Sequence, residues 1–247
     1  SSTKGNLNND LGVPLTILAA DNTADYWVIE MGAAQAGDIA RLMSIVNPHI
    51  STITNVGSAH VGRFGGVDGI AFGKAEIYRH LMAEGTAIIN ADDHYANEWL
   101  AAHKGRVVTF SRENHKADVT AKNIDCQSDA SAMVLHYQDS QTPITINLPG
   151  LHNVSNALCA SACALAAGVA IDVIAKGLAS IHAENGRLQL KTAASGARIF
   201  DDSYNANPSS VKAAIAVLAL QQGRKILVLG DMAELGAAAS RYHADVG

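Results

Sequence analysis

The chain has 247 residues, of which 48% are hydrophobic and 17% are charged, enough apolar material for one large domain or one and a half ordinary ones. Eighteen Lys and Arg stand against 23 Asp and Glu, and this net charge of -5 excludes the basic footprint of a nucleic-acid-binding protein. No apolar stretch approaches the roughly 20 residues that span a bilayer. The chain opens without a signal-like segment and its three cysteines lack a C-x-x-C spacing, so we expect a cytoplasmic protein without membrane insertion.

Short apolar runs alternate with helical patterns in the first half of the chain. Strands are predicted at residues 26–29, 50–54, 87–89 and 107–110, and helices at residues 37–45 and 66–81. This alternation is typical of a parallel sheet with crossover helices. Alternating residues at 120–124, 133–137 and 144–148 then predict an antiparallel ribbon. We therefore expect an α/β fold with a mixed, mainly parallel sheet flanked by helices.

The second half of the chain begins with two predicted helices, at residues 153–167 and 172–181, and restarts after the tripeptide at residues 185–187. A strand at residues 199–201, a helix at 208–220 and a strand at 225–229 follow. A doubly wound domain needs several such βα units. We expect one domain at residues 1–187 and the start of an incomplete Rossmann-like domain at residues 188–247.

Polar residues follow several of the predicted strands, at the edge of a parallel sheet where ligands bind. Glu30, Asn55, Asn90 and Asp92 end or follow strands, and His60 comes five residues after Asn55. Such a set suits a hard cation that shares nucleotide oxygens, the usual way in which Mg²⁺ is held. The alternative is that these residues simply end strands and begin turns.

Lys74 falls on the apolar stripe of the predicted helix at residues 66–81. An inward lysine near a nucleotide can contact phosphate, or can be carbamylated to an anion that helps to hold a metal. The alternative is a lysine whose ammonium group reaches solvent. Asp202, in the pair that ends the strand at 199–201, could bind ribose hydroxyls.

Five segments together resemble the Mur ligases, and among them the members that add D-alanyl-D-alanine. They are residues 5–14 (GNLNNDLGVP), 28–33 (VIEMGA), 150–157 (GLHNVSNA), 201–208 (DDSYNANP) and 230–236 (GDMAELG). The resemblance implies that residues 1–187 are a P-loop-type central ATP-binding domain and that residues 188–247 begin the C-terminal domain. No G-x-x-x-x-G-K-[ST] loop occurs in the chain. We therefore expect the isolated chain to be inactive.

The resemblance also implies an activity, in which ATP phosphorylates a carboxylate and an amine attacks the acyl phosphate. The substrates would be UDP-N-acetylmuramoyl-tripeptide and D-alanyl-D-alanine, and the enzyme would be a monomer that makes peptidoglycan precursors. Two alternatives stay open: a non-catalytic fragment of such an enzyme, and a related ligase such as folylpolyglutamate synthase.

The roles that the resemblance implies for single residues fall into three groups. Glu30, His60 and Lys74 would hold Mg²⁺, with Lys74 carbamylated, and Asn6 would lie near the reacting phosphate. Arg187 would reach the γ-phosphate. The nucleotide would be bordered by His152, Asn153, Asn156, Asp202, Tyr204 and Asn205, with Asn156 on the adenine and Asp202 on the ribose.

Overall fold

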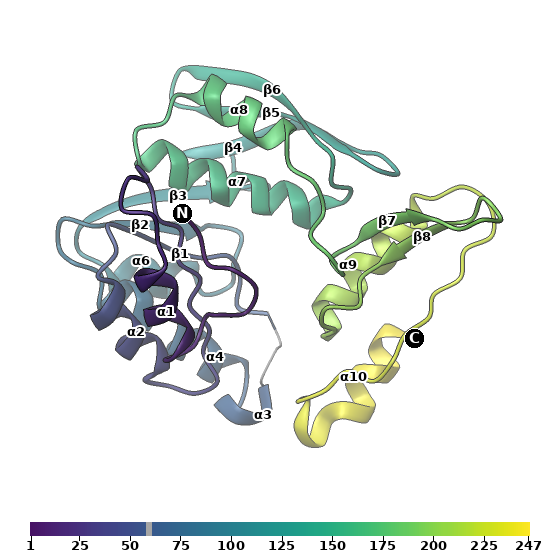
Figure 1. The fold of residues 1–247 in the computed structure, drawn as a ribbon, viewed down its shortest axis with the longest axis horizontal. Helices are drawn as coiled ribbons and strands as arrows, with labels where there is room; N and C mark the ends of the chain where they lie inside the picture. The colour runs from purple at the N-terminus through teal and green to yellow at the C-terminus, as the bar shows by residue number, and fades with distance from the viewer. Residues whose placement is uncertain (58–60) are drawn as a thin grey trace.

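The computed structural model describes residues 1–57 and 61–247, and a six-stranded sheet forms its larger part (Figure 1). The strands lie side by side in chain order: the first four are parallel to one another, and the fifth and sixth are each antiparallel to the strand before. They are β1 (Ile50–Ile53), β2 (Thr86–Asn90), β3 (Arg106–Ser111), β4 (Val119–Cys126), β5 (Ser131–Tyr137) and β6 (Ser140–Ile146). The prediction of a mixed, mainly parallel sheet is confirmed.

Helices cover both faces of this sheet, and every residue of its second strand, β2, is buried. Ile88 packs into one core with α7 (Leu151–Ala166) and α8 (Ile171–Ala179). Ala87 and Ile89 point the other way, as alternate residues of a strand do, toward the core that includes residues of α2 (Asp38–Val46), α5 (Glu76–Arg79) and α6 (Ala96–Ala102). The continuous apolar run of β2 therefore reflects burial between two helical layers.

The predicted strand at residues 26–29 is wrong. This segment forms a single parallel bridge, between Ser2 and Val28, and lies after helix α1 (Gly12–Leu18). Thr3 N donates to Val28 O (3.0 Å) and Val28 N donates to Ser1 O (2.9 Å). Among the residues that the structure describes, only this short N-terminal stretch pairs with it, so no strand ladder forms and Val28 stays 68% exposed.

The predicted helix at residues 66–81 is divided. It consists of α4 (Val67–Lys74) and α5, and a short helix α3 (Val61–Phe64) precedes them. At the break, Tyr78 N and Arg79 N both donate to the carbonyl of Ala75 (3.0 and 3.1 Å). The apolar stripe is buried as predicted, and Lys74 on that stripe is half-buried.

Residues beyond 188 form a smaller part of the molecule (Figure 1). The strands β7 (Gln189–Thr192) and β8 (Arg198–Asp201) pair as an antiparallel hairpin. Helix α9 (Pro208–Ala219) begins with a capping box on Asn207 and with proline at its first position, as expected for a helix start. Further along are a 3₁₀ turn (Gly236–Ala238) and α10 (Ala239–Val246).

The predicted strand at residues 225–229 is also wrong, because this segment has no regular secondary structure. Its composition favours a strand, but no described strand pairs with it, and Val228 is 91% exposed. In the part of the chain that the structure describes, no helix has the length and apolar character needed to cross a bilayer.

Candidate active site

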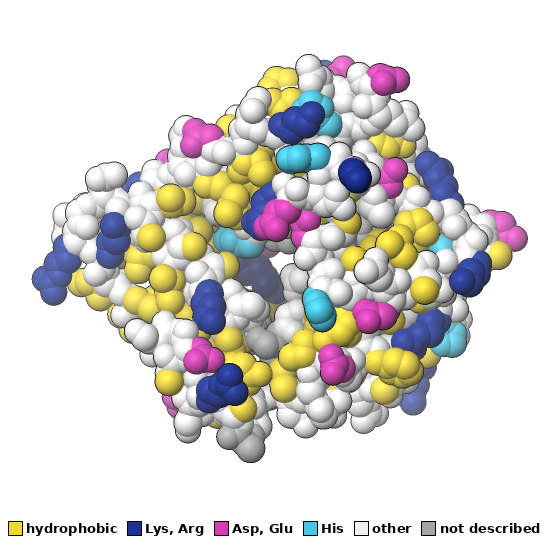
Figure 2. Space-filling view, turned by 180° about the vertical axis from the view of Figure 1, so that it is seen from behind, with side chains coloured by type: hydrophobic (Ala, Val, Ile, Leu, Met, Phe, Trp, Pro, Cys, Tyr) yellow, Lys and Arg dark blue, Asp and Glu magenta, His cyan; other side chains and the backbone are white. Residues whose placement is uncertain are grey.

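A cleft of about 520 Å³ lies between the six-stranded part and the C-terminal part. Figure 2 shows a hollow near the middle of the molecule, with charged and histidine side chains around it. Six residues that the sequence put forward for the site line the cleft together: Asn55, His152, Asn153, Asn156, Arg187 and Asp202. Its size is within the usual range for small-molecule sites.

One wall of the cleft is the first turn of α7. Asn153 Nδ2 donates to Pro149 O (2.9 Å), and Asn156 Nδ2 lies 3.5 Å from Asn153 Oδ1. Gly150 precedes the helix with φ +98°, and a Cβ there would lie 2.8 Å from Val217 Cγ2. Glycine at this position therefore lets α9 approach the start of α7.

His152 lines the cleft from the first turn of α7. Burial lowers the pKa of His152 below its ordinary value, and the carboxylate of Asp202 opposes this shift. Asp202 Oδ1 accepts a hydrogen bond from Leu188 N (3.0 Å). The neighbouring Asp201 is engaged elsewhere, because an ion pair with Lys191 (2.5 Å) and a hydrogen bond from Ser203 lower its pKa to about 2. Of the two adjacent carboxylates, Asp202 is the one at the cleft.

Arg187 enters the cleft from the link between the two parts. Its guanidinium group lies over the ring of Tyr204, 4.1 Å from the ring centroid. Tyr204 and Asn205 are exposed and do not line the cleft in the described structure, and Asn205 Oδ1 accepts from Ala206 N (2.9 Å). The start of α9 is a lining segment that our sequence reasoning missed, although its N-P-S-S sequence signals a helix start; it contributes Asn207, Ser209 and Ser210.

Lys74 contacts the backbone of the segment that lines the cleft. Its Nζ donates to the carbonyls of Asn55 (2.9 Å) and Val56 (2.8 Å), and Asn55 is itself a lining residue. Burial lowers the pKa of Lys74, and the carboxylate of Asp93 opposes this shift. Lys74 therefore has a larger share of neutral amine than an exposed lysine has.

Glu30 lies outside the set of cleft-lining residues. Its Oε1 accepts from Asn8 Nδ2 (2.8 Å), and its backbone N donates to Thr3 Oγ1 (2.9 Å). Asn8 was not predicted, yet its carbonyl also accepts from Gly32 N (2.7 Å), so it holds both the carboxylate of Glu30 and the backbone that follows it. Asn6 is exposed in the same loop.

His60, the other predicted magnesium ligand, lies outside the described residues. Within the described ranges, no three His, Cys, Asp or Glu side chains form a metal-binding group.

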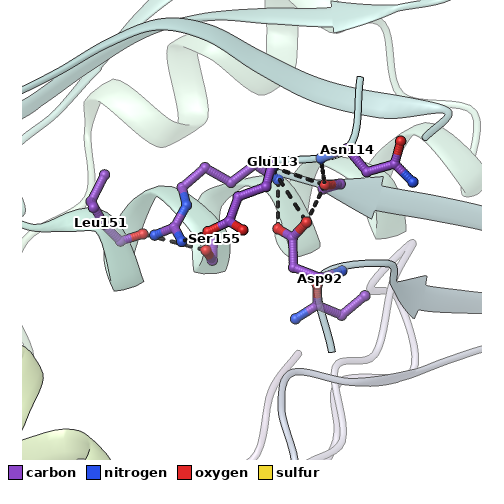
Figure 3. Close-up of polar contacts among 8 residues, drawn as sticks. Asp92, Glu113, Asn114, Leu151 and Ser155 are labelled. Carbon is purple, nitrogen blue, oxygen red and sulfur yellow. Dashed lines mark hydrogen bonds and ion pairs between the residues drawn. The ribbon is translucent and has the colours of Figure 1, made fainter. Parts of the chain in front are cut away.

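Asn90 and Asp92, which also follow a strand, stabilise loops. Asn90 Nδ2 donates to Thr54 O (3.1 Å), and its Oδ1 accepts from Asp92 N (3.1 Å). The carboxylate of Asp92 accepts from the Ser111 hydroxyl and from the backbone N of Arg112 (2.7 Å) and Glu113 (3.3 Å), as Figure 3 shows for the loop after β3. These contacts are those expected of the alternative, in which both residues end a strand and begin a turn.

Comparisons with known proteins extend over the whole chain. The family descriptions "Mur ligase middle domain" and "Mur ligase, glutamate ligase domain" match residues 1–164 and 186–247. UDP-N-acetylmuramoyl-tripeptide--D-alanyl-D-alanine ligase of Escherichia coli is 41% identical over 246 residues, which cover 99% of this chain and 54% of that protein.

Solved structures agree with this similarity. The crystal structure of MurF from Acinetobacter baumannii superposes with a TM-score of 0.95 at 40% identity, over 99% of this chain and 53% of that one. MurF of Thermotoga maritima in complex with ADP superposes with a TM-score of 0.90 at 28% identity, over 100% and 56%. The chain spans about half the length of the relatives that it matches. From its motifs, its fold and these similarities, the chain belongs to the Mur ligase family.

Proposed function

We propose that this chain forms the ATP-handling part of a ligase that joins D-alanyl-D-alanine to UDP-N-acetylmuramoyl-tripeptide. The observation that carries the proposal is the cleft, where residues far apart in the sequence, from Asn55 to Ala213, line one cavity. The relatives named for this reaction support the choice of substrates. A cytoplasmic location and a monomeric state stay predictions.

Each wall of the cleft offers chemistry that a nucleotide requires. Amide side chains such as that of Asn156 can both donate and accept, as recognition of a base edge needs. The carboxylate of Asp202 can accept from ribose hydroxyls, and the guanidinium group of Arg187 suits phosphate oxygens. Bound ATP would supply the phosphoryl group that activates the carboxylate of the tripeptide. The residues of this chain would position the reacting groups and neutralise their charge.

Mg²⁺ and a carbamylated Lys74 belong to the same proposal. Glu30, held by Asn8, offers one carboxylate for the metal. The two hydrogen bonds that Lys74 now donates are those of an unmodified amine. A carbamate keeps a single N–H, so carbamylation would release at least one of the carbonyls of Asn55 and Val56. The lowered pKa of Lys74 favours the neutral amine that reacts with CO₂.

Release of inorganic phosphate tests the function, in a protein that carries this chain together with a phosphate-binding loop. We expect phosphate release to require ATP, Mg²⁺, UDP-N-acetylmuramoyl-tripeptide and D-alanyl-D-alanine together, with L-alanyl-L-alanine as the matched control dipeptide. Phosphate release that does not depend on the dipeptide, or that requires folate and glutamate instead, would refute the proposed reaction.

Calorimetric titration of ATP and Mg²⁺ into the 247-residue chain separates the catalytic from the non-catalytic alternative for that chain. The backbone N–H groups and the lysine of a phosphate loop contribute much of the affinity for phosphate groups, so we expect binding weaker than micromolar. Micromolar binding or turnover by the 247-residue chain would contradict the expectation that it is inactive.

A further inference from the structure

We propose that Tyr204 is a positioning residue, whose ring holds the guanidinium group of Arg187 in the orientation that meets the terminal phosphate of the nucleotide. This inference rests on the proposed function, since it names a residue that acts through Arg187 in the same cleft. The geometry that points to it is the contact of 4.1 Å between the guanidinium carbon and the centre of the ring.

The backbone around Arg187 runs against the segment that carries Tyr204. Tyr204 N donates to Gly186 O (3.0 Å), and Leu188 N donates to Asp202 Oδ1 (3.0 Å). Arg187 therefore lies between two hydrogen bonds that join residues 186–188 to residues 202–204. Gly186 has φ +70°, and a Cβ there would lie 3.1 Å from Tyr204 N, so the close approach requires glycine.

Stacking on the ring uses one face of the guanidinium group and leaves its edge free. All five N–H donors of arginine lie in the plane of the group and point outward from that edge. A guanidinium group that stacks on Tyr204 can therefore still donate to phosphate oxygens, and cation–π attraction restricts the many rotamers of its long side chain. Arg187 would otherwise lose that freedom when the nucleotide binds.

The ring of Tyr204 carries this role, and the hydroxyl does not. Tyr204 is 53% exposed, and its contact with Arg187 is made by the ring. Phenylalanine would offer the same face to the guanidinium group. The two roles can therefore be separated by substitution.

The experiment compares Tyr204→Leu with Tyr204→Phe, in the ligase that contains this chain, by calorimetric Kd values for ADP and for the non-hydrolysable β,γ-methylene analogue of ATP. We expect Tyr204→Leu to weaken binding of the analogue about two- to fivefold, the size of an exposed cation–π contact, and to leave the Kd of ADP unchanged. Tyr204→Phe should bind both as the parent does. In the Arg187→Ala background, Tyr204→Leu should have no further effect.

Each other outcome overturns the inference in a recognisable way. Equal weakening of ADP and analogue by Tyr204→Leu would mean a general structural role or a direct contact with the nucleoside. Weakening by Tyr204→Phe would assign the role to the hydroxyl, and an undiminished effect in the Arg187→Ala background would exclude action through Arg187. If the parent bound neither nucleotide, the proposed function would fail as well, whereas normal parent binding with no effect of Tyr204→Leu would refute this inference alone.

Discussion

Tyr78 joins α5 to the two strands that lead to the cleft, and removing its hydroxyl tests how that end of the sheet is held. The side chain is fully buried. Its hydroxyl accepts from Ile53 N (2.9 Å), the last residue of β1, and donates to Ile88 O (2.7 Å) in β2. Two residues after Ile53 comes Asn55, whose carbonyl accepts from Lys74. The hydroxyl thus supports the segment that Lys74 contacts.

Tyr78→Phe keeps the ring, so we expect it to leave no cavity and to remove only the two hydrogen bonds of the hydroxyl. The N–H of Ile53 would stay buried without a partner, at a cost of about 1–3 kcal/mol in the free energy of unfolding, and the Ile88 carbonyl, with two lone pairs, would add less. Urea unfolding measures this cost. Tyr95→Phe is the control, since the hydroxyl of Tyr95 bonds to Asp68 at the surface, where water can replace it. Equal losses for the two variants would refute the reasoning.

Three other predictions concern single ionisable side chains. The buried carboxylate of Glu76 accepts from the N–H groups of Gly37 (2.8 Å) and Ala40 (3.0 Å), so Glu76→Ala should lower the free energy of unfolding by about 2–3 kcal/mol in urea, with Glu76→Gln losing less. Burial lowers the pKa of His152, so below pH 6.5 the unfolded chain binds more protons than the folded chain does. The free energy of unfolding should therefore be lower at pH 5.5 than at pH 7.5 in urea, and the difference should be smaller in His152→Asn. Lys74→Ala should abolish phosphate release by the complete ligase, with partial rescue by short carboxylic acids if a carbamate is the working species and none if a plain lysine is.

The sequence predicts those elements whose partners are near in the chain. The ribbon of β4, β5 and β6 has an alternating pattern and short connections, and each of these strands pairs with the next one along the chain. Helices α7 and α8 follow from their apolar periodicity. Each of these patterns reports which face of an element is buried, and that face is set locally by the period of the element.

The two wrong strands, at residues 26–29 and 225–229, show where this reasoning ends. Both segments have the composition of a buried strand, but a strand also needs a partner for its backbone groups. Val28 meets one short segment, and the structure describes no partner strand for Val228. The hairpin strand β7 is the opposite case. Its sequence Q-L-K-T gives little indication of a strand, yet it forms one because β8 pairs with it.

The residues of the candidate site also fall into those that the sequence could identify and those that it could not. Lys74 could be found from helical periodicity, and Asp202 from its place after a strand, because each signal is local. The sequence could not tell which polar residues after strands stabilise loops. Asp92 resembles Glu30 in its position, but its carboxylate accepts hydrogen bonds from the loop after β3. The contact between Arg187 and Tyr204 depends on a turn and a hairpin together, and periodicity does not encode it.

The cleft itself depends on contacts that join the two parts of the chain around it. Gln221 Nε2 donates to Ser128 O (2.7 Å), and an exposed ion pair joins Arg63 to Glu234 (3.2 Å). Such a surface ion pair contributes at most about 1 kcal/mol, and the hydrogen bond contributes a similar amount. The orientation that brings Asp202 opposite α7 therefore rests in part on weak contacts of this kind. A nucleotide that touched both walls would add its own contacts to these, and occupancy of the cleft would then be linked to the arrangement of the two parts.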